Sequence, residues 1–357
     1  MIQVSKSLKI VREFIMKARN KGIDHVKAYA TMMVIFAHAL NDNYFVSNYA
    51  DIHEYSRLFN TFFSLLSSTA VPLFLMATGY YLYDRDRNFK ELIKKKIFPL
   101  WLPFAAWIVL NRPLNSYSIL EDLPAILKEI FLLKSPWPHY LWYIPALFGI
   151  YLLSPIIRKA LLSLKKKDYL YLFGIVLFVK SFDYYYLLSK MYGGTDLSLT
   201  IGIYLSTSLL FMYSIYGYYF KKYIEKEKYF RKSALLLAFL FILIFIPQFQ
   251  LINHQIGHRI YYYPLGILFS FLTFNVIYRL RVPKIFEKGL RFLSINSLSY
   301  YFGHRFILYQ FNQNYFFFNR PVNTILSFAL AVAMITVFIL FYQSIKKIIS
   351  REKSVEL

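Results

Sequence analysis

The chain contains no cysteine. This absence excludes a disulfide, a thiolate nucleophile and a thiolate metal site. Acidic residues are also scarce, with 19 Asp and Glu against 42 Lys and Arg, which gives a formal net charge of +23. The N-terminal stretch is basic but lacks a continuous apolar segment and a small-residue cleavage site, so we expect no signal peptide.

Apolar residues are what the chain has in excess. Of its 357 residues, 57% are hydrophobic and 20% aromatic, and the mean hydropathy is +0.40. That is too apolar for a soluble domain of this size. Apolar runs wide enough to cross a hydrocarbon core of roughly 30 Å recur from end to end. The predicted spans are 24–41, 59–83, 97–112, 140–157, 168–187, 200–220, 233–251, 260–279, 292–311 and 324–344. We therefore predict an all-α, polytopic bundle of about ten transmembrane helices.

A net charge this positive is compatible with nucleic-acid binding, so the placement of the basic residues has to decide what the charge is for. Most of them fall in the stretches 6–21, 85–96, 158–167, 221–232, 279–291 and 346–353, which lie on alternate loops between the predicted spans. The positive-inside rule expects this pattern of cytoplasmic segments. We therefore expect membrane lipids rather than nucleic acid as the partner, and both termini in the cytoplasm.

The predicted spans divide the chain into three parts. Residues 1–23 place Val4, Leu8, Val11 and Ile15 on one helical face, which predicts an amphipathic helix lying on the inner leaflet. Residues 24–344 form the membrane domain, and residues 345–357 form a basic cytoplasmic tail. We expect the protein in the cell membrane.

Ionisable side chains inside a membrane are costly and mark functional candidates. The first span contains Asp24, Lys27 and His38. At about 100° per residue, Lys27 and His38 return to nearly the same face of a helix, about 16 Å apart along its axis. Asp24 can pair with Lys27 on that face. The alternative is that Lys27 snorkels to the interface and a neighbouring helix satisfies His38.

The ninth span carries a second polar stripe. Ser297, Tyr300 or Tyr301, and His304 recur at helical spacing, and the stripe must face the interior of the bundle. The alternative reading is interhelical hydrogen bonding that only holds the bundle together. The second span contains Thr78 and ends beside Arg85 at the predicted cytoplasmic exit.

At these residues the chain resembles the integral-membrane acyltransferase family 3, the bacterial enzymes that acylate surface glycans. Lys27 and His38 look like the family's basic residue followed about ten positions later by a His, with Lys where Arg is usual. Residues 74–80 look like its Phe-Phe-x-x-Ser-Gly-Tyr element, with Thr78 in place of Ser. Residues 141–144 look like its Leu-Trp-Phe-Leu element, and residues 296–304 like its late Ser-Tyr-His element.

The resemblance implies transfer of an acyl group, acetyl first, from cytoplasmic acyl-CoA to a hydroxyl of a surface polysaccharide or lipid-linked sugar. Lys27, Arg85 and Arg87 could hold the anionic CoA head, together with Thr78. A sugar hydroxyl needs a positioned base, a role we assign to His38. His304 would be a second proton-handling group or an oxyanion donor, and Tyr301 could share the donor role. An acyl-His38 intermediate is an alternative.

Other residues and other functions stay open at this stage. Aromatic residues on the predicted outer side are candidates for sugar stacking or for an interfacial belt, namely Trp137, His139, Tyr140, Trp142, Tyr184, Tyr185, Tyr186 and residues 315–318. His254 and His258 are spaced like metal ligands but lack a carboxylate or cysteine nearby, so we expect no metal site. An exporter or flippase without chemistry, and a non-catalytic scaffold, are the competing functions; the oligomeric state is undetermined.

Overall fold

The computed structural model describes residues 20–44, 53–114, 118–191, 209–251, 263–314 and 319–352. In these ranges the regular structure is helical throughout, which confirms the predicted all-α class. The first half contains α2 (Lys21–Tyr44), α3 (Glu54–Ser67), α4 (Ala70–Leu82), α5 (Phe89–Leu92), the π-helix η2 (Ile93–Ile97), α6 (Phe98–Leu114), α7 (Leu123–Ile130), the 3-10 helix η3 (His139–Trp142) and α8 (Tyr143–Ser163). The second half contains α9 (Lys166–Met191), α11 (Leu209–Tyr219), the π-helix η4 (Phe220–Ile224), α12 (Phe230–Leu251), α13 (Pro264–Arg279), α14 (Lys284–Ile295), α15 (Ser297–Asn314) and α16 (Arg320–Glu352).

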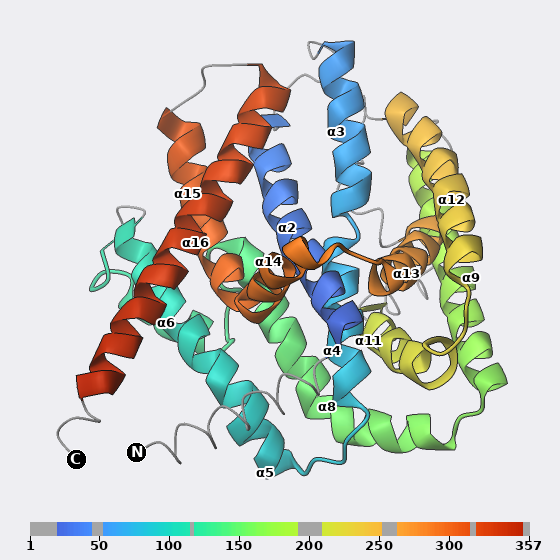
Figure 1. Ribbon diagram of the computed structural model, residues 1–357, viewed down its shortest axis with the longest axis horizontal. Coiled ribbons are helices and arrows are strands. Elements are labelled where there is room, and N and C mark those ends of the chain that lie inside the picture. The colour runs from blue at the N-terminus through green and yellow to red at the C-terminus, as the bar shows by residue number, and fades with distance from the viewer. Residues whose placement is uncertain are drawn as a thin grey trace.

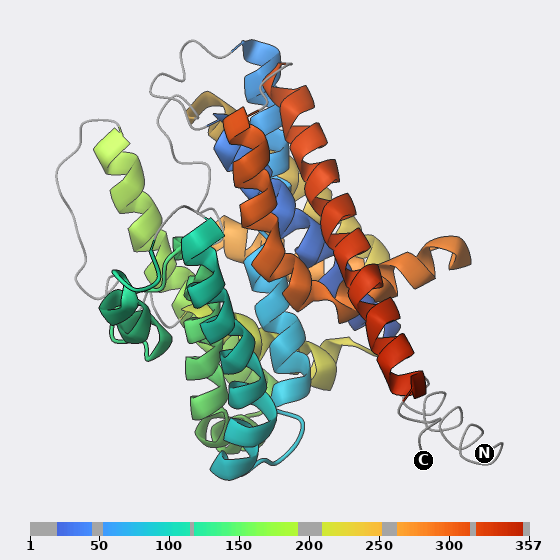
Figure 2. The same ribbon diagram turned by 90° about the vertical axis from the view of Figure 1, so that its left-hand side faces the viewer.

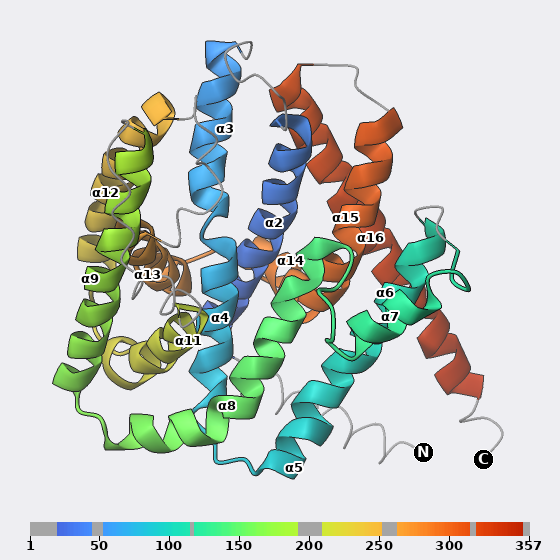
Figure 3. The same cartoon turned by 180° about the vertical axis from the view of Figure 1, so that it is seen from behind.

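Helix α2 is the centre of the bundle. It contacts α3 and α4 on one side, α15 and α16 on another, and α13 and α14 near its start. Figure 1 shows it between these elements, and the view from behind in Figure 3 shows the α6–α8 pair set to one side and α9 with α12 to the other. In the side view of Figure 2, α15 and α16 run next to each other along the bundle. The polar residues of α2 therefore lie among other helices rather than on the outer surface.

Four helical stretches of the described chain are long and apolar enough to cross a membrane, namely Glu54–Leu82, His139–Ser163, Phe230–Pro247 and Arg320–Ile348. Their outward faces are apolar. Val337, Phe338 and Phe341 on α16, and Leu235 and Phe239 on α12, are largely exposed. An exposed apolar surface of this extent is expected of helices that face lipid rather than water. The count of ten spans and the location of the termini stay predictions.

Two predicted spans are interrupted by residues that belong to no helix. The span 59–83 is divided at Ser68 and Thr69, whose hydroxyl groups donate to the carbonyls of Leu65 and Leu66 at 2.7 Å each. Pro72 has no N–H to continue the hydrogen-bond ladder there, which accounts for the interruption. The predicted start of the ninth span at 292 was also wrong, because α14 ends at Ile295 and α15 begins only at Ser297.

Some predictions fall outside the described residues. These are residues 1–19 of the N-terminal amphipathic helix, residues 200–208 and 260–262 at the starts of two spans, the His254 and His258 pair, and residues 315–318. The side chains of Tyr184, Tyr185 and Tyr186 are likewise not described.

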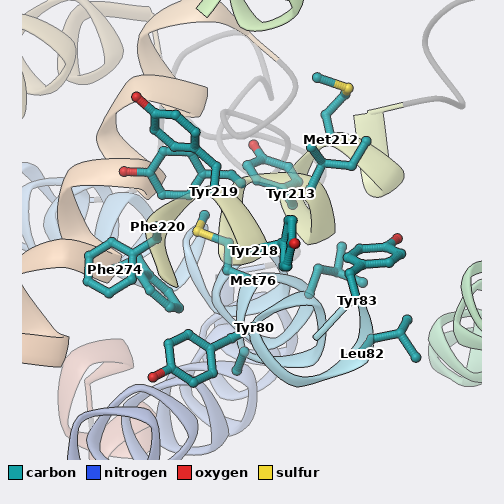
Figure 4. Packing of buried hydrophobic residues seen from close by; sticks show 14 of the residues in the cluster. Met76, Tyr80, Leu82, Tyr83, Met212, Tyr213, Tyr218, Tyr219, Phe220 and Phe274 are labelled. Atoms are coloured by element: carbon teal, nitrogen blue, oxygen red, sulfur yellow. The ribbon is translucent and has the colours of Figure 1, made fainter. Parts of the chain in front are cut away.

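Helices α4 and α11 cross so closely that glycine is required at the contact. A Cβ atom on Gly79 would lie 1.8 Å from the Ser214 carbonyl oxygen, and one on Gly217 would lie 1.9 Å from the Met76 carbonyl oxygen. Small residues allow this approach between membrane helices. Around the crossing, large aromatic side chains fill the interior, including Tyr83, Tyr213 and Phe220 (Figure 4). Gly79 of the family-like element at 74–80 thus has a packing role.

Alanine at Gly79 or Gly217 should therefore destabilise the bundle. Both substitutions force a methyl group onto a neighbouring backbone, so we expect a cost at or above the upper end of the roughly 1–3 kcal/mol that overpacking produces. Thermal unfolding in detergent would measure it. Gly289→Ala is the matched control, since nothing lies within 4 Å of that position on α14. Equal stability of the Gly79→Ala and Gly289→Ala variants would contradict the crossing.

Candidate functional site

Two cavities lie along α2, and each contains one of its two predicted functional residues. Lys27, near the start of the helix, lines a cavity of about 470 Å³ that we call the basic cavity. His38 lines a second cavity of about 560 Å³, the histidine cavity. The helical rise places these two residues about 16 Å apart along the axis. The face of α2 that carries Lys27 and His38 therefore lines both cavities, one at each residue.

The basic cavity collects cations from three different elements. Lys27 comes from α2, Arg87 from the turn after α4, and Lys96 from η2. One guanidinium nitrogen of Arg87 donates to the Leu82 carbonyl at 2.8 Å, which holds the side chain at the cavity wall. Three cations around one cavity, with Asp24 as its acidic member, are suited to a ligand with several negative charges.

Lys96 was missed as a site residue in the sequence. Lys94 and Lys95 beside it are exposed, whereas Lys96 is half-buried, so the helical register rather than the basic run decides which one lines the cavity. Burial lowers the pKa of Lys96, and the charges of Arg87 and then Arg85 lower it further. A cation held this way gains from a bound anion.

The other predicted donor-site residues take different places. Thr78 lines the basic cavity, and its hydroxyl donates to the Phe74 carbonyl at 2.9 Å. Arg85 is exposed on the turn after α4 and is not among the residues of the cavity wall, so its contribution there is one of charge.

Asp24 links α2 to α14, the helix that precedes α15. The Ser294 hydroxyl of α14 donates to its carboxylate at 2.7 Å, and both side chains are buried. Ser294 carried no signal in the sequence, because it precedes the family-like element at 296–304. The Asp24–Lys27 pairing stays a prediction. Ser297 is the first residue of α15 and is half-buried.

The histidine cavity is lined mainly by aromatic and polar side chains. Trp137, His139, Tyr140 and Trp142, four of the predicted sugar-stacking candidates, lie in its wall together with Asn111 and Arg305. Aromatic faces beside a few polar groups are typical of small-ligand sites.

A buried ion pair fixes one side of this cavity. Arg112 at the end of α6 donates to Glu129 of α7 at 3.0 Å, and both side chains are at most 6% exposed. The other carboxylate oxygen of Glu129 accepts from the Trp137 backbone N–H at 3.2 Å. The Arg112 guanidinium also lies 4.8 Å from the centre of the Trp137 ring. The segment that carries Trp137 is thereby attached to α6 and α7.

The fold brings His38 and His304 together, which is the central feature of the site. Their ring centroids are 5.0 Å apart, although the residues come from α2 and α15. His304 is fully buried, and its Nδ1 lies 2.9 Å from the Tyr300 carbonyl oxygen. A carbonyl only accepts, so Nδ1 is the protonated nitrogen and Nε2 carries the lone pair. Among the described residues, nothing hydrogen-bonds to this Nε2.

Two contacts hold α15, the helix of His304, against the neighbouring helices α2 and α16. Arg305 of α15 donates to both carboxylate oxygens of Asp42 on α2, at 2.5 and 2.6 Å. The Tyr300 and Thr336 hydroxyls are 2.5 Å apart, which ties α15 to α16. Neither Asp42 nor Thr336 was a candidate in the sequence.

Tyr140 connects the histidine pair to the aromatic wall. Its ring is 5.3 Å from that of His304, and its hydroxyl donates to the Phe302 carbonyl while accepting from Trp107, at 2.9 and 2.6 Å. The Tyr301 hydroxyl donates to the Tyr140 carbonyl at 2.6 Å. In this arrangement the Tyr301 hydroxyl already donates its hydrogen to a carbonyl, and of the paired histidines His38 is the one that lines the cavity.

Comparisons with known proteins connect this geometry to a family. The model of acyltransferase family 3, described as an acyltransferase domain, matches residues 20–343. A serine/alanine racemase of Enterococcus gallinarum is 33% identical over 172 residues, which are 44% of this chain and 23% of that protein. An amino-acid racemase of Enterococcus faecalis is 25% identical over 293 residues, 78% of this chain and 38% of the racemase.

The chain spans well under half the length of these curated relatives. No solved structure matches it significantly. The family model, in contrast, covers α2 through most of α16 and thus both cavities and both histidines. The chain therefore belongs to the integral-membrane acyltransferase family 3.

Proposed function

We propose that this acyltransferase moves an acyl group, in the first place acetyl, from cytoplasmic acyl-CoA to a hydroxyl of a surface polysaccharide or lipid-linked sugar. The observation that carries the proposal is the pair of histidine rings 5.0 Å apart beside the aromatic-lined cavity, with a basic cavity further along the same helix. The two cavities match the two substrates in chemistry.

The donor would bind in the basic cavity. Acyl-CoA carries several phosphate charges, and Lys27, Arg87 and Lys96 supply cations from three elements around one space. Its pantetheine arm is comparable in length to the distance of about 16 Å between Lys27 and His38. The thioester can thus approach His38 while the head group stays among the cations.

The acceptor would bind in the histidine cavity, where His38 meets its hydroxyl group. His38 takes the hydroxyl proton while the oxygen attacks the thioester carbonyl; the C–S bond then breaks, and the proton passes to the departing thiolate to give free CoA. The Nε2 lone pair of His304 can accept an N–H from His38 after a small ring movement, which would orient the imidazole and stabilise its charged form. His304 then acts as a positioning residue behind the base.

The predicted topology would put the two cavities at opposite sides of the membrane. Lys27, Arg87 and Lys96 belong to or adjoin the basic stretches at 6–21 and 85–96, which the positive-inside rule places in the cytoplasm. The basic cavity would then open to the inner side of the cell membrane, where acyl-CoA is found, and the histidine cavity to the outer side. Both termini would be cytoplasmic, with ten spans between them.

An exporter or flippase without chemistry is the second candidate function. Two cavities on opposite parts of a helical bundle also suit a transport pathway. The His38–His304 pair supplies a proton acceptor beside the aromatic-lined cavity, which acyl transfer to a hydroxyl requires and export without chemistry does not, and this favours catalysis. The activity named for the racemases is not carried over, because this chain matches only a part of each.

Cysteine labelling would test the topology on a chain that has no cysteine of its own. Single cysteines near Lys95, Lys166, Lys228 and Lys284, and at both termini, should react only from the cytoplasmic side. Cysteines near Tyr49, Asn115, Gly194, Gln255 and Gln313 should react from outside. External labelling of either terminus would overturn the ten-span arrangement.

Lys96 and Lys95 form a matched pair for testing the donor site. Lys96→Ala should raise the KM for acyl-CoA roughly tenfold, the scale of one lost charge-assisted contact. Lys95→Ala should leave it unchanged, because Lys95 is exposed and pairs with Glu91 at 2.9 Å. Lys27→Ala should resemble Lys96→Ala, whereas Lys27→Arg keeps the charge and much of the activity. Indistinguishable KM values for the Lys96 and Lys95 variants would remove Lys96 from the donor site.

His38→Ala separates the enzyme from the transporter. The variant should insert and fold, because one lost interhelical contact costs about 1 kcal/mol. Acyl transfer should nonetheless fall by about 10²-fold or more, the usual scale for losing a positioned base. Mass spectrometry of surface glycans should then find the polymer in normal quantity but unacylated. Loss of the polymer itself at normal protein levels would favour the transporter, and normal acylation would remove His38 from the mechanism.

A further inference from the structure

A row of aromatic rings lies between the two cavities. It begins at Phe74 of α4, which lines the basic cavity, and ends at Tyr140 of η3, which lines the histidine cavity. Tyr143 of α8 and Tyr301 of α15 lie between them. The centroid distances along the row are 6.2 Å from Phe74 to Tyr143, 5.9 Å from Tyr143 to Tyr301 and 5.8 Å from Tyr301 to Tyr140. Neighbouring rings at such distances are in contact.

Tyr143 occupies the middle of this row. It packs against both of the large apolar clusters, the one built around α4 and α11 and the one built around α6 and α8. Phe74, its neighbour in the row, lines the basic cavity. Tyr143 therefore stands at the end of the basic cavity, with Tyr301 on its other side.

The two rings nearest the histidines are held by backbone contacts. The Tyr301 hydroxyl donates to the Tyr140 carbonyl, and the Tyr140 hydroxyl donates to the Phe302 carbonyl, so η3 and α15 are linked twice. The Tyr143 ring is placed by packing against Phe74 and Tyr301. A packed ring adjusts by rotation more readily than a doubly linked pair, which makes Tyr143 the ring that can move.

We propose that Phe74, Tyr143, Tyr301 and Tyr140 form an aromatic barrier that separates the donor cavity from the acceptor cavity, and that Tyr143 limits the acyl group that passes to a short one. The acyl carbon has to reach His38 from the basic cavity, and the four rings lie in contact with one another from that cavity to the histidine cavity. The separation of the two cavities is independent of the proposed acyl transfer, whereas the limit on acyl length rests on that proposed function.

The barrier can be tested by labelling, without any assay of activity. Tyr309, an exposed residue that lines the histidine cavity, is changed to Cys to identify the side on which that cavity opens. Thr78→Cys places a single thiol in the basic cavity of a chain that otherwise has none. A membrane-impermeant maleimide added to sealed vesicles from the Tyr309 side should not react with the Cys at position 78. Adding Tyr143→Ala should make that thiol react at least tenfold faster from this side.

Two controls make the labelling decisive. Tyr143→Phe keeps the ring and should leave the thiol at position 78 protected. Labelling from the opposite side should proceed at the same rate in all three backgrounds, which shows that the variants are folded. Reaction from the Tyr309 side with Tyr143 intact, or continued protection in Tyr143→Ala with normal labelling from the opposite side, would each overturn the barrier.

Donor preference tests the second half of the proposal. With purified protein in detergent, Tyr143→Ala should raise the ratio of kcat/KM for a hexanoyl donor to that for acetyl-CoA at least tenfold, and Tyr143→Phe should leave the ratio unchanged. An unchanged ratio in an active Tyr143→Ala enzyme would overturn the limit on acyl length. Absence of acyl transfer from the unmodified protein would instead overturn the proposed function, and the labelling result would stand by itself.

Discussion

A polar side chain inside a bilayer has to find its partner within the protein, and this constraint organises the centre of the bundle. Helix α2 carries Asp24, Lys27, His38 and Asp42, far more polar groups than lipid would tolerate. Two of its carboxylates bind groups on other helices: Asp24 accepts from Ser294 of α14, and Asp42 accepts from Arg305 of α15. Helices with the complementary groups therefore surround α2, and the apolar helices α12 and α16 present broad exposed faces.

The same constraint creates a site that no single helix contains. The Asp42–Arg305 contact fixes α15 against α2, and this places His304 next to His38. Because the Tyr300 carbonyl occupies Nδ1 of His304, the remaining lone pair is directed into the interior. Polar groups that are required for packing and polar groups that can perform chemistry thus lie next to each other on the same two helices.

The positions of the two cavities depend on where the helices pack most closely. Gly79 and Gly217 let α4 approach α11 at backbone distance, which places Phe74 and Thr78 on the side of α4 that faces the basic cavity. The segment from α6 to α8, in which the Arg112–Glu129 ion pair joins α6 to α7, supplies the aromatic wall of the histidine cavity. A bundle that brings two such units together around α2 has one cavity lined by cations and another lined by aromatic residues.

The helical class, the membrane environment and the candidate pairs Lys27–His38 and Tyr301–His304 can be predicted from the sequence, because apolar length, basic loops and helical spacing are local properties. The packing of α2 against α15, in contrast, is what brings His38 and His304 together, since the two residues are far apart in the chain. Helix packing explains two further features of the site. It also decided that Lys96 rather than Arg85 lines the basic cavity, because helical register selects one lysine from a run of three. The roles of Ser294 and Asp42 became visible in the same way, as did the position of Tyr143 from the family-like element at 141–144. Each depends on a partner in another helix, and no spacing along the chain encodes such a partner.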